Sequence, residues 1–459
     1  MGDAESETGP AGGAVPEHSS PREVTLGVDE ALHVALQLHR AGSPREAEAL
    51  YRRILVVVPE NLNALHFLGL LCHQQNRKKE AAELIERIVA LDPHNADAHN
   101  NLGNVLEGLG KGLEAEACYR KAIALQPGHA PAHNNLGVVL MAQRRVAEAI
   151  EAYHRATALE PDSPDFRYNL GNALRRAGKT EEAIVAYRDA VALKPEHGGA
   201  WQGLARTFLQ AGRREEAAGV YEEWLRREPG NPVVLYLRAA CLGHGAPPKA
   251  PAAYVQQIFD DMASSFDAYL VESLGYRAPG LLCDALCAVL PSPASTLDIL
   301  DAGCGTGLCA PLLRPYARHL TGVDLSAGML AKAGGQQAYD DLVQAELTDF
   351  MDRKAEAYDV IASADTLCYF GDLAPVFSAA ANALKPSGIL AFTLEDEGDE
   401  GPGFRLHPYG RYAHRKSYVE DTLGAASLAV HSIASVVLRK EGGRPVAGHL
   451  VVARKQPAA

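Results

Sequence analysis

The chain has 459 residues, enough for two or three domains, and 47% of them are hydrophobic while 22% are charged. No apolar run approaches the roughly 18 residues that a membrane-spanning helix requires, so no membrane partner is expected. The formal net charge of −13 argues against a general nucleic-acid-binding protein, which would carry a basic surface.

Residues 1–27 are rich in Gly, Pro, Ser and Glu and have no apolar core. This composition predicts a disordered N-terminal tail and not a signal peptide. The eight cysteines are scattered and form no C-x-x-C pair. Their spacing favours reduced thiols and a cytoplasmic location.

A period of 34 residues follows the tail. Proline recurs every 34 residues. Three other positions recur with the same period: one is always alanine, one is glycine or alanine, and one is mostly tyrosine. The prolines are Pro59, Pro93, Pro127, Pro161, Pro195 and Pro229. The pattern resembles the tetratricopeptide repeat (TPR), a pair of antiparallel helices. The resemblance implies an all-α solenoid of six units over 28–231, with a concave groove, followed by a capping helix and linker at 232–251.

Three asparagines, Asn101, Asn135 and Asn169, recur at one register in the first helix of successive units. Asparagine is a poor helix former, and these positions lie too far inside the helix to be caps. One interpretation is a ladder that hydrogen-bonds a protein or peptide in the groove, similar to the groove of O-GlcNAc transferase. The other is that repeat duplication simply copied them.

Residues 252–459 alternate between helix and strand patterns after the linker. A helix pair is expected at 252–273 and 276–290. Strands are expected at 297–302, 319–324, 341–345, 358–363 and 388–394, and a closing β-hairpin at 430–440 and 445–454. Such alternation predicts a mostly parallel sheet covered by helices on both faces.

A glycine-rich turn follows the first of these strands, in the order Asp301, Gly303, Gly305 and Gly307. A dinucleotide turn needs G-x-G-x-x-G, but Leu308 occupies the sixth place here. The turn therefore suits a ribose with a short charged tail better than a pyrophosphate. Asp324 ends the next strand, where its carboxylate can accept hydrogen bonds from two ribose hydroxyls.

The turn, Asp324, Glu346, the strand 358–363 and the segment 384–388 occur in the order and spacing of five motifs. With the closing hairpin, they resemble the class I S-adenosylmethionine (SAM) methyltransferases. The resemblance implies a Rossmann-like α/β domain with a mostly parallel seven-stranded sheet and an antiparallel C-terminal hairpin. It also implies that SAM is held by eight residues, namely Asp301, Gly303, Gly305, Gly307, Asp324, Leu325, Glu346 and Leu347. For two of these residues an alternative to SAM binding remains: Asp301 could only cap the end of its strand, and Glu346 could be a surface acid.

The methyl acceptor is less well marked, because methyl transfer needs alignment more than acid–base chemistry. Asp365 and Tyr369 are expected on the substrate side. His407 and His414, in the loop 404–414, could hold an acceptor or take its proton, although an exposed polar loop is the alternative. No metal-ligand spacing stands out.

The whole chain is similar to the bacterial group of TPR-containing predicted methyltransferases. Three functions follow as hypotheses. The first is a methyltransferase whose repeats recruit a protein, and the second is a binding scaffold with an idle SAM domain. The third is a small-molecule methyltransferase that uses its repeats for assembly. Nucleic acid is not expected as a partner.

Overall fold

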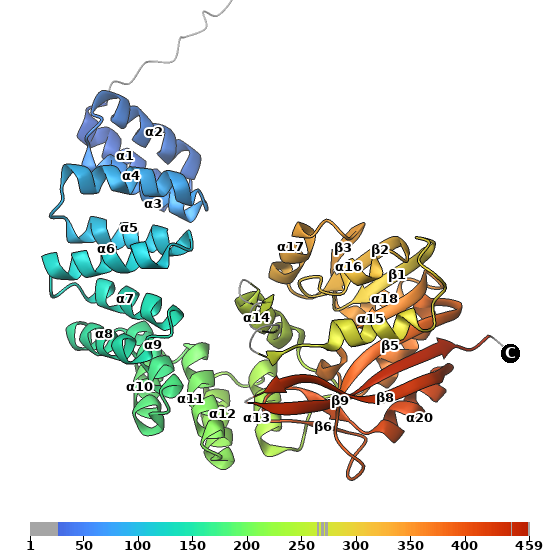
Figure 1. Cartoon of the computed structure of the whole chain (residues 1–459). Coiled ribbons are helices and arrows are strands. Elements are labelled where there is room, and N and C mark those ends of the chain that lie inside the picture. Colours follow the sequence, from blue (N-terminus) through green and yellow to red (C-terminus); the bar gives the residue numbers. More distant parts are fainter. Residues whose placement is uncertain (1–25, 264–265, 268–269, 271–273, 442, 458–459) are drawn as a thin grey trace, which may run out of the picture. The chain divides into compact units, whose positions relative to one another are not determined.

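The computed structural model describes residues 26–263, 266–267, 270, 274–441 and 443–457. The chain divides into two compact units, Met1–Ala177 and Gly178–Ala459 (Figure 1). Most of the predicted tail 1–27 and part of the predicted helix 252–273 lie outside the described residues.

The described part of the first unit is a series of helices joined by short turns. They are α1 (Val28–Arg40), α2 (Pro44–Val57), α3 (Leu62–Gln74), α4 (Lys78–Leu91), α5 (Ala96–Gly108), α6 (Gly112–Leu125), α7 (Ala130–Ala142), α8 (Val146–Leu159) and α9 (Pro164–Arg176). The second unit opens in the same way with α10 (Thr180–Leu193), α11 (Gly198–Gln210), α12 (Arg214–Arg227) and α13 (Pro232–Leu242).

Small residues let the two helices of a repeat approach closely. A Cβ at Gly103 would lie 2.5 Å from the ring of Tyr119, and a Cβ at Gly137 would lie 2.6 Å from Tyr153. The periodic prolines lie two residues beyond the even-numbered helices from α2 to α12, where a missing N–H costs little. The 34-residue period therefore follows from the packing of one helix pair.

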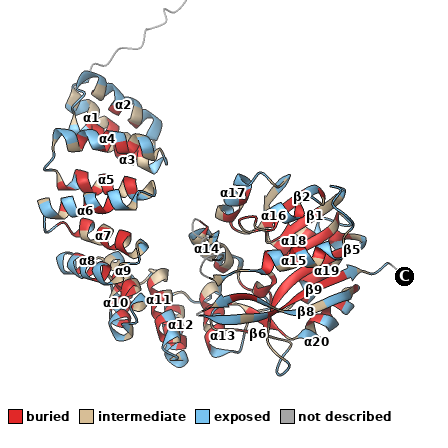
Figure 2. Cartoon of the chain, in the orientation of Figure 1, coloured by how far each residue is buried: buried red, intermediate tan, exposed pale blue. Residues whose placement is uncertain are grey.

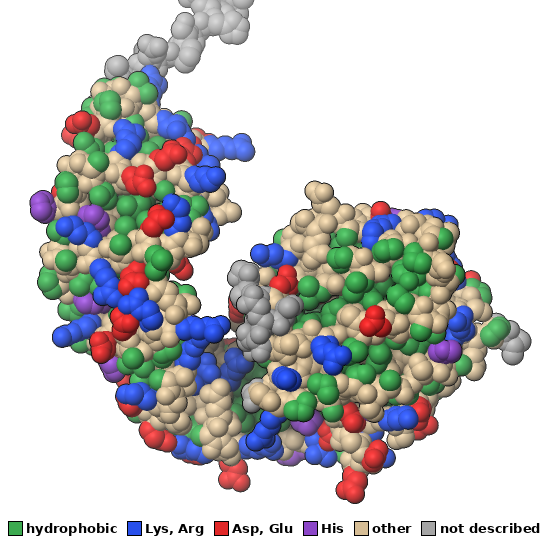
Figure 3. Space-filling view, in the orientation of Figure 1, with side chains coloured by type: hydrophobic (Ala, Val, Ile, Leu, Met, Phe, Trp, Pro, Cys, Tyr) green, Lys and Arg blue, Asp and Glu red, His purple; other side chains and the backbone are tan. Residues whose placement is uncertain are grey.

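Ion pairs join consecutive repeats on the surface. Glu48 on α2 pairs with Arg77 at 2.7 Å, and Glu116 on α6 pairs with Arg145 at 2.8 Å, each arginine preceding the second helix of the next repeat. On the face shown in Figure 3, acidic and basic side chains are accordingly interspersed over the repeats.

The second unit continues with helices and a mixed sheet. Its helices are α14 (Ala252–Met262), α15 (Ala278–Cys287), α16 (Ala310–Leu313), α17 (Ala327–Gly335), α18 (Leu347–Asp352), the 3-10 turn η2 (Leu367–Tyr369), α19 (Ala374–Ala383) and α20 (Lys416–Ala425). Its strands are β1 (Leu297–Ala302), β2 (Ala317–Asp324), β3 (Asp341–Gln344), β4 (Tyr358–Ser363), β5 (Leu384–Asp396), β6 (Phe404–Leu406), β7 (Tyr412–His414), β8 (Leu428–Glu441) and β9 (Arg444–Lys455).

Strands β3, β2, β1, β4 and β5 are parallel neighbours in that order, and β9 pairs with β5 antiparallel and with β8 as a hairpin. These are the seven strands expected from the sequence. The structure adds the short hairpin β6–β7, paired to the end of β5 through Glu395 and Asp396. The sequence analysis had treated these residues as a loop.

Both faces of the sheet are covered, as Figure 2 shows by the burial of its central strands. Along β1, Ile299 packs with α15 and α16 on one face, while Leu300 packs with α18, α19 and α20 on the other. Alternate side chains of a parallel strand thus reach two separate cores. Among the described helices, none is long and apolar enough to cross a membrane.

The predicted linker is held against the sheet domain by its backbone. Pro248 O accepts hydrogen bonds from Gly371 N and Asp372 N, both at 2.8 Å, and Ala250 N donates to Tyr369 O at 2.8 Å. Lys249 forms an isolated antiparallel bridge with Phe370. Residues 248–250 therefore lie beside the turn that follows β4.

Candidate functional site

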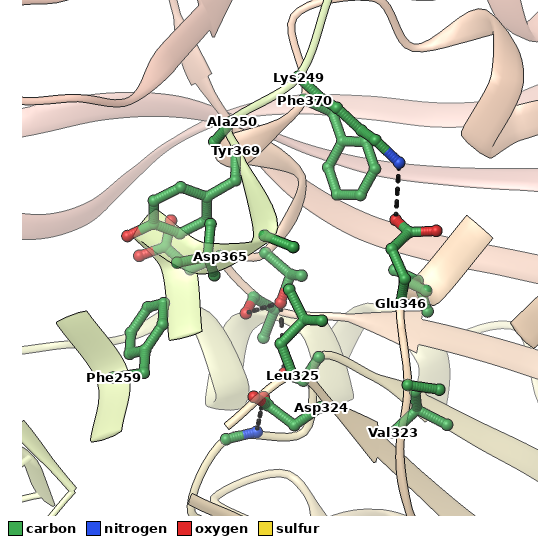
Figure 4. A pocket seen from close by; sticks show the side chains of 18 of the residues that line it. Lys249, Ala250, Phe259, Val323, Asp324, Leu325, Glu346, Asp365, Tyr369 and Phe370 are labelled. Carbon is green, nitrogen blue, oxygen red and sulfur yellow. Dashed lines mark hydrogen bonds and ion pairs between the residues drawn. The ribbon is translucent and has the colours of Figure 1, made fainter. Parts of the chain in front are cut away.

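A cavity lies at the carboxyl ends of β1, β2 and β4, where ligands bind in open α/β sheets (Figure 4). Its wall combines the glycine turn, the residues that follow β2, β3 and β4, the segment 249–252 and helix α14. The lining is mainly apolar with a few polar groups, the composition that is typical of small-molecule sites.

The glycine turn enters the cavity through Gly303 and Gly305. Both have positive φ, +76° and +54°, a conformation that favours glycine. A Cβ at Gly303 would overlap Thr366 Oγ1, whereas a Cβ at Gly305 would meet nothing within 4 Å. Gly303 is therefore required by protein packing, and Gly305 leaves open space beside the turn.

Asp324 lines the cavity at the end of β2. Its Oδ2 accepts from Gly305 N and its Oδ1 from Ser326 N, each at 2.9 Å. Burial raises the pKa of this carboxyl, while the backbone N–H groups lower it. A carboxylate has about four lone-pair positions, so acceptor capacity remains for hydroxyls of a ligand.

Asp301 lies behind the turn and is not part of the cavity wall. It is 1% exposed, and its Oδ2 accepts from the Tyr339 hydroxyl at 2.6 Å. Burial raises the pKa of this carboxyl to about 7. Gly307, with φ +90°, also lies outside the cavity wall and packs against the same Tyr339 ring. The structure thus places both residues where they shape the turn, and neither reaches the ligand space directly.

Glu346 and Leu347 line the cavity after β3, together with Leu325 after β2. Glu346 caps α18 by accepting from Asp349 N at 2.9 Å, and its Oε1 lies 3.3 Å from Lys249 Nζ (Figure 4). The carboxylate is therefore both a helix cap and an anchor for the linker.

These observations accompany clear sequence similarities. A family model described as a methyltransferase domain matches residues 300–392. Tetratricopeptide repeat models match 35–96, 100–164, 135–195 and 174–241. The chain carries tetratricopeptide repeats followed by a methyltransferase domain.

Curated relatives match a part of the chain only. It is 42% identical over 100 residues to Methyltransferase-like protein 27 of Homo sapiens, covering 22% of this chain and 39% of that protein. It is 37% identical over 110 residues to Malonyl-[acyl-carrier protein] O-methyltransferase of Enterobacter lignolyticus, covering 24% of this chain and 43% of that protein. The chain thus spans less than half the length of these relatives. Among solved structures it is similar to YrrB, a TPR protein with an unusual peptide-binding site (22% identity, TM-score 0.33, 38% of this chain and 91% of that chain).

Asp365 follows β4 at the opposite end of the methyltransferase cavity from Glu346 (Figure 4). Its φ of +56° is unusual for a non-glycine residue, and Asp365 N donates to Thr393 Oγ1 at 2.8 Å. Its Oδ2 accepts from Arg439 Nη1 at 2.6 Å. Within the described part of the chain, its Oδ1 has no hydrogen-bond partner. Tyr369 lines the same end, and its ring meets Phe259 of α14 edge to face at 5.6 Å.

Arg439 belongs to a buried ion cluster that the sequence analysis missed. Besides Asp365, it pairs with Glu395 of β5 and donates to Glu441 Oε1 at 2.8 Å. Arg411 donates to Glu395 Oε1 at 2.6 Å and also pairs with Glu441. The only signal in the sequence was an arginine inside the apolar strand pattern of 428–441.

The structure places His407 and His414 outside the methyltransferase cavity, contrary to the expectation that they meet an acceptor. His414 is fully buried in β7, where its Nε2 lies 3.1 Å from Gly371 O, and burial lowers its pKa to about 4. His407 pairs with Glu397 at 2.8 Å. Their segment forms the β6–β7 hairpin because its polar side chains find partners within the fold. The described residues hold no group of three or more His, Cys, Asp or Glu that could bind a metal ion.

The repeat asparagines bond to one another across neighbouring units. Asn135 Nδ2 donates to Asn100 Oδ1 at 3.0 Å and to Asn104 Oδ1 at 2.9 Å. Asn169 Nδ2 donates to Asn134 Oδ1 at 2.9 Å, and Asn101 Oδ1 accepts a long bond of 3.5 Å from Asn100 Nδ2. The bonds of Asn135 and Asn169 give these two asparagines a role between repeats, whether or not they also contact a partner, whereas the bond of Asn101 stays within α5.

Proposed function

We propose that the chain transfers a methyl group from SAM to an acceptor on a protein that its repeats recruit. The cavity carries this proposal, because one space joins the open side of the glycine turn to Asp324 and, at its far end, to Asp365 and Tyr369. A cofactor site and an acceptor site must share such a space if the methyl group is to be attacked in line.

The residues present fit SAM. Gly305 leaves room beside the turn, and Asp324 has lone pairs left for the two ribose hydroxyls. Leu325 and Leu347 offer apolar contacts to an adenine ring, with Glu346 beside them. When bound, SAM would supply an electrophilic methyl group on a sulfonium. The chain's own contribution is to position the two reactants and to exclude water.

Recruitment by the repeats is the second part of the proposal. TPR arrays generally present a groove to a peptide or protein. This chain covers only 39% and 43% of the two curated methyltransferases named above, so the acceptors in the names of such relatives are not assigned to it.

Calorimetry with SAM and with S-adenosylhomocysteine tests the first part. We expect micromolar binding by the full chain and at least a tenfold loss in Asp324→Ala, because the ribose hydroxyls lose their acceptor. Asp421→Ala, at an exposed position on α20, is the matched control and should bind as the wild type does. Absence of binding at micromolar concentrations, or full affinity in Asp324→Ala, would refute the proposed site.

Removal of residues 1–163, the tail and the first four repeats, tests recruitment. This boundary falls between two repeats and keeps the whole second compact unit, including α13 and the linker that packs on the sheet domain. Transfer of labelled methyl groups from SAM into protein of a cell extract should fall strongly, while SAM affinity stays the same. Undiminished labelling would show that repeats 28–163 do not tether the acceptor.

A further inference from the structure

The cavity has an acceptor end with an unusual electrostatic character. Asp365 reaches it with a carboxylate of which only Oδ2 is hydrogen-bonded within the described residues. Oδ1 has less than 1 Å² of accessible surface, so the carboxylate must turn toward the cavity for a ligand to reach this oxygen. A buried, unpartnered carboxylate oxygen is costly, so a ligand that donates a hydrogen bond there would be stabilised.

The ion cluster behind Asp365 does not neutralise it. Three carboxylates, Asp365, Glu395 and Glu441, share two guanidiniums, Arg411 and Arg439. The cluster therefore holds one more carboxylate than guanidinium groups, and Glu441 is its partly exposed member. Burial raises the pKa of Asp365, whereas the charge of Arg439 lowers it. Asp365 is the one member of this cluster that lines the cavity.

Aromatic rings surround the same end of the cavity. Phe259, Tyr276 and Tyr369 line it, and Phe259 and Tyr369 meet edge to face. Figure 4 shows Phe259, Asp365 and Tyr369 converging at this end. Burial raises the pKa values of the Tyr276 and Tyr369 hydroxyls well above their usual range, so both side chains are neutral. Neutral aromatic faces beside a carboxylate attract an organic cation.

An anionic acceptor finds no comparable partner. Among the described lining residues, Lys249 is the single lysine or arginine, and it is paired with Glu346 at 3.3 Å. A substrate carboxylate placed next to Asp365 would instead face a like charge in a low-dielectric site.

We propose that the methyl acceptor is an alkyl amine, such as the side-chain amine of a lysine on the recruited protein. This inference rests on the proposed function and names its acceptor class. Before the amine enters the cavity, its ammonium gives one proton to bulk water, and the bound amine then donates an N–H bond to the Asp365 carboxylate. Its nitrogen lone pair forms the N–C bond while the C–S bond breaks and sulfur keeps the electron pair. Positive charge thus moves from sulfur to nitrogen, beside Asp365, which stabilises the transition state more than the ground state.

Arg439 is a positioning residue in this arrangement. It holds Oδ2 of Asp365 and thereby fixes the carboxylate at this end of the cavity. It does not line the cavity itself.

The test uses two probes of similar size and opposite charge, n-butylammonium and butyrate. Each is titrated into the full chain saturated with S-adenosylhomocysteine. We expect n-butylammonium to bind at least ten times more tightly than butyrate. Asp365→Asn should lose at least tenfold of the ammonium affinity and keep its affinity for S-adenosylhomocysteine within twofold. Equal or weaker binding of the ammonium, including no binding, would overturn the inference.

Asp365→Asn could lose ammonium affinity because the ion cluster rearranges, so a second variant leaves the cluster intact. Phe259→Leu keeps the carboxylate and most of the side-chain volume but removes one aromatic face, and should weaken ammonium binding several-fold. Unchanged ammonium affinity in either variant would also overturn the inference. Failure of S-adenosylhomocysteine to bind counts against the proposed function instead, so the two failures are distinguishable.

Discussion

The hydroxyl of Tyr236 on α13 donates a hydrogen bond of 3.0 Å to the carbonyl of Gly410, 174 residues away in the β6–β7 turn. Tyr236 is fully buried, and its ring packs against Tyr254 of α14 and Tyr412 of β7. The last helix of the repeat region is therefore built into the methyltransferase domain. It contacts both the helix that covers the cavity and the hairpin that carries Arg411.

Replacing Tyr236 with Phe should loosen this junction selectively. The ring contacts persist, but the carbonyl of Gly410 loses its donor, at a cost of about 1 kcal/mol. Hydrogen exchange of amides in 232–242 and 404–414 should become about fivefold faster, while exchange in 297–302 stays the same. Tyr316→Phe, which removes an exposed hydroxyl, is the control. Equal exchange in wild type and Tyr236→Phe would show that the bond does not stabilise the junction.

The two glycines of the turn should respond differently to alanine. In Gly303→Ala, the Cβ overlaps Thr366 and φ is positive, so we expect a loss of more than about 2 kcal/mol in stability. In Gly305→Ala, only the positive φ is unfavourable, at about 1–2 kcal/mol, but the Cβ occupies the ligand space.

Urea unfolding and SAM calorimetry separate these effects. Gly305→Ala should remain folded but lose affinity for SAM. Gly303→Ala should lose both stability and affinity for SAM. Gly335→Ala, at the end of α17 with open space around it, should change neither property adversely. A Gly305→Ala variant that binds SAM normally would contradict the placement of the cofactor.

The apolar runs of the sequence predicted the central strands well. Strands β1 (Leu297–Ala302) and β4 (Tyr358–Ser363) begin and end where the sequence analysis placed them. Parallel strands that are buried on both faces read as continuous apolar segments bounded by polar or small residues. The repeat helices could be predicted from the sequence equally well, because packing of one helix pair imposes the 34-residue period.

The β6–β7 hairpin could not be predicted from the sequence, because the residues that its side chains contact lie far away along the chain. Arg411 finds Glu395 16 residues earlier and Glu441 30 residues later, while Asp365 finds Arg439 74 residues away. In isolation these side chains indicate an exposed polar loop. Asp301 shows the same limit, since Tyr339, 38 residues away, determines that its carboxyl points behind the turn.

Replacing Asp301 with Asn should change the pH dependence of stability. The pKa of Asp301 is raised by burial to about 7, so its neutral form stabilises the fold below pH 4. This contribution is lost as the pH rises from about 4 to 7, because the unfolded carboxyl ionises more readily. His414, whose pKa is lowered to about 4, titrates in both proteins and cancels in the comparison.

Between pH 5 and pH 8, the wild type should therefore lose about 2–3 kcal/mol more stability than Asp301→Asn. Urea unfolding followed by near-ultraviolet circular dichroism measures both values. Identical pH dependence in the two proteins would mean that the carboxyl of Asp301 ionises in the folded state as easily as in the unfolded state.

Replacing Asn135 distinguishes two roles of the repeat asparagines, a structural role between repeats and a role in partner binding alone. Both hydrogens of its side-chain amide are used, on Asn100 and Asn104 of the preceding repeat. Asn135→Ala should therefore destabilise the contact between α5 and α7 by about 1–3 kcal/mol, seen as faster amide exchange in 130–142. Asn101→Ala removes one long bond only and should leave exchange nearly unchanged. If Asn135→Ala exchanges like the wild type, the bonds between repeats contribute little stability. Recognition of a peptide would then be the better explanation for asparagine at this register.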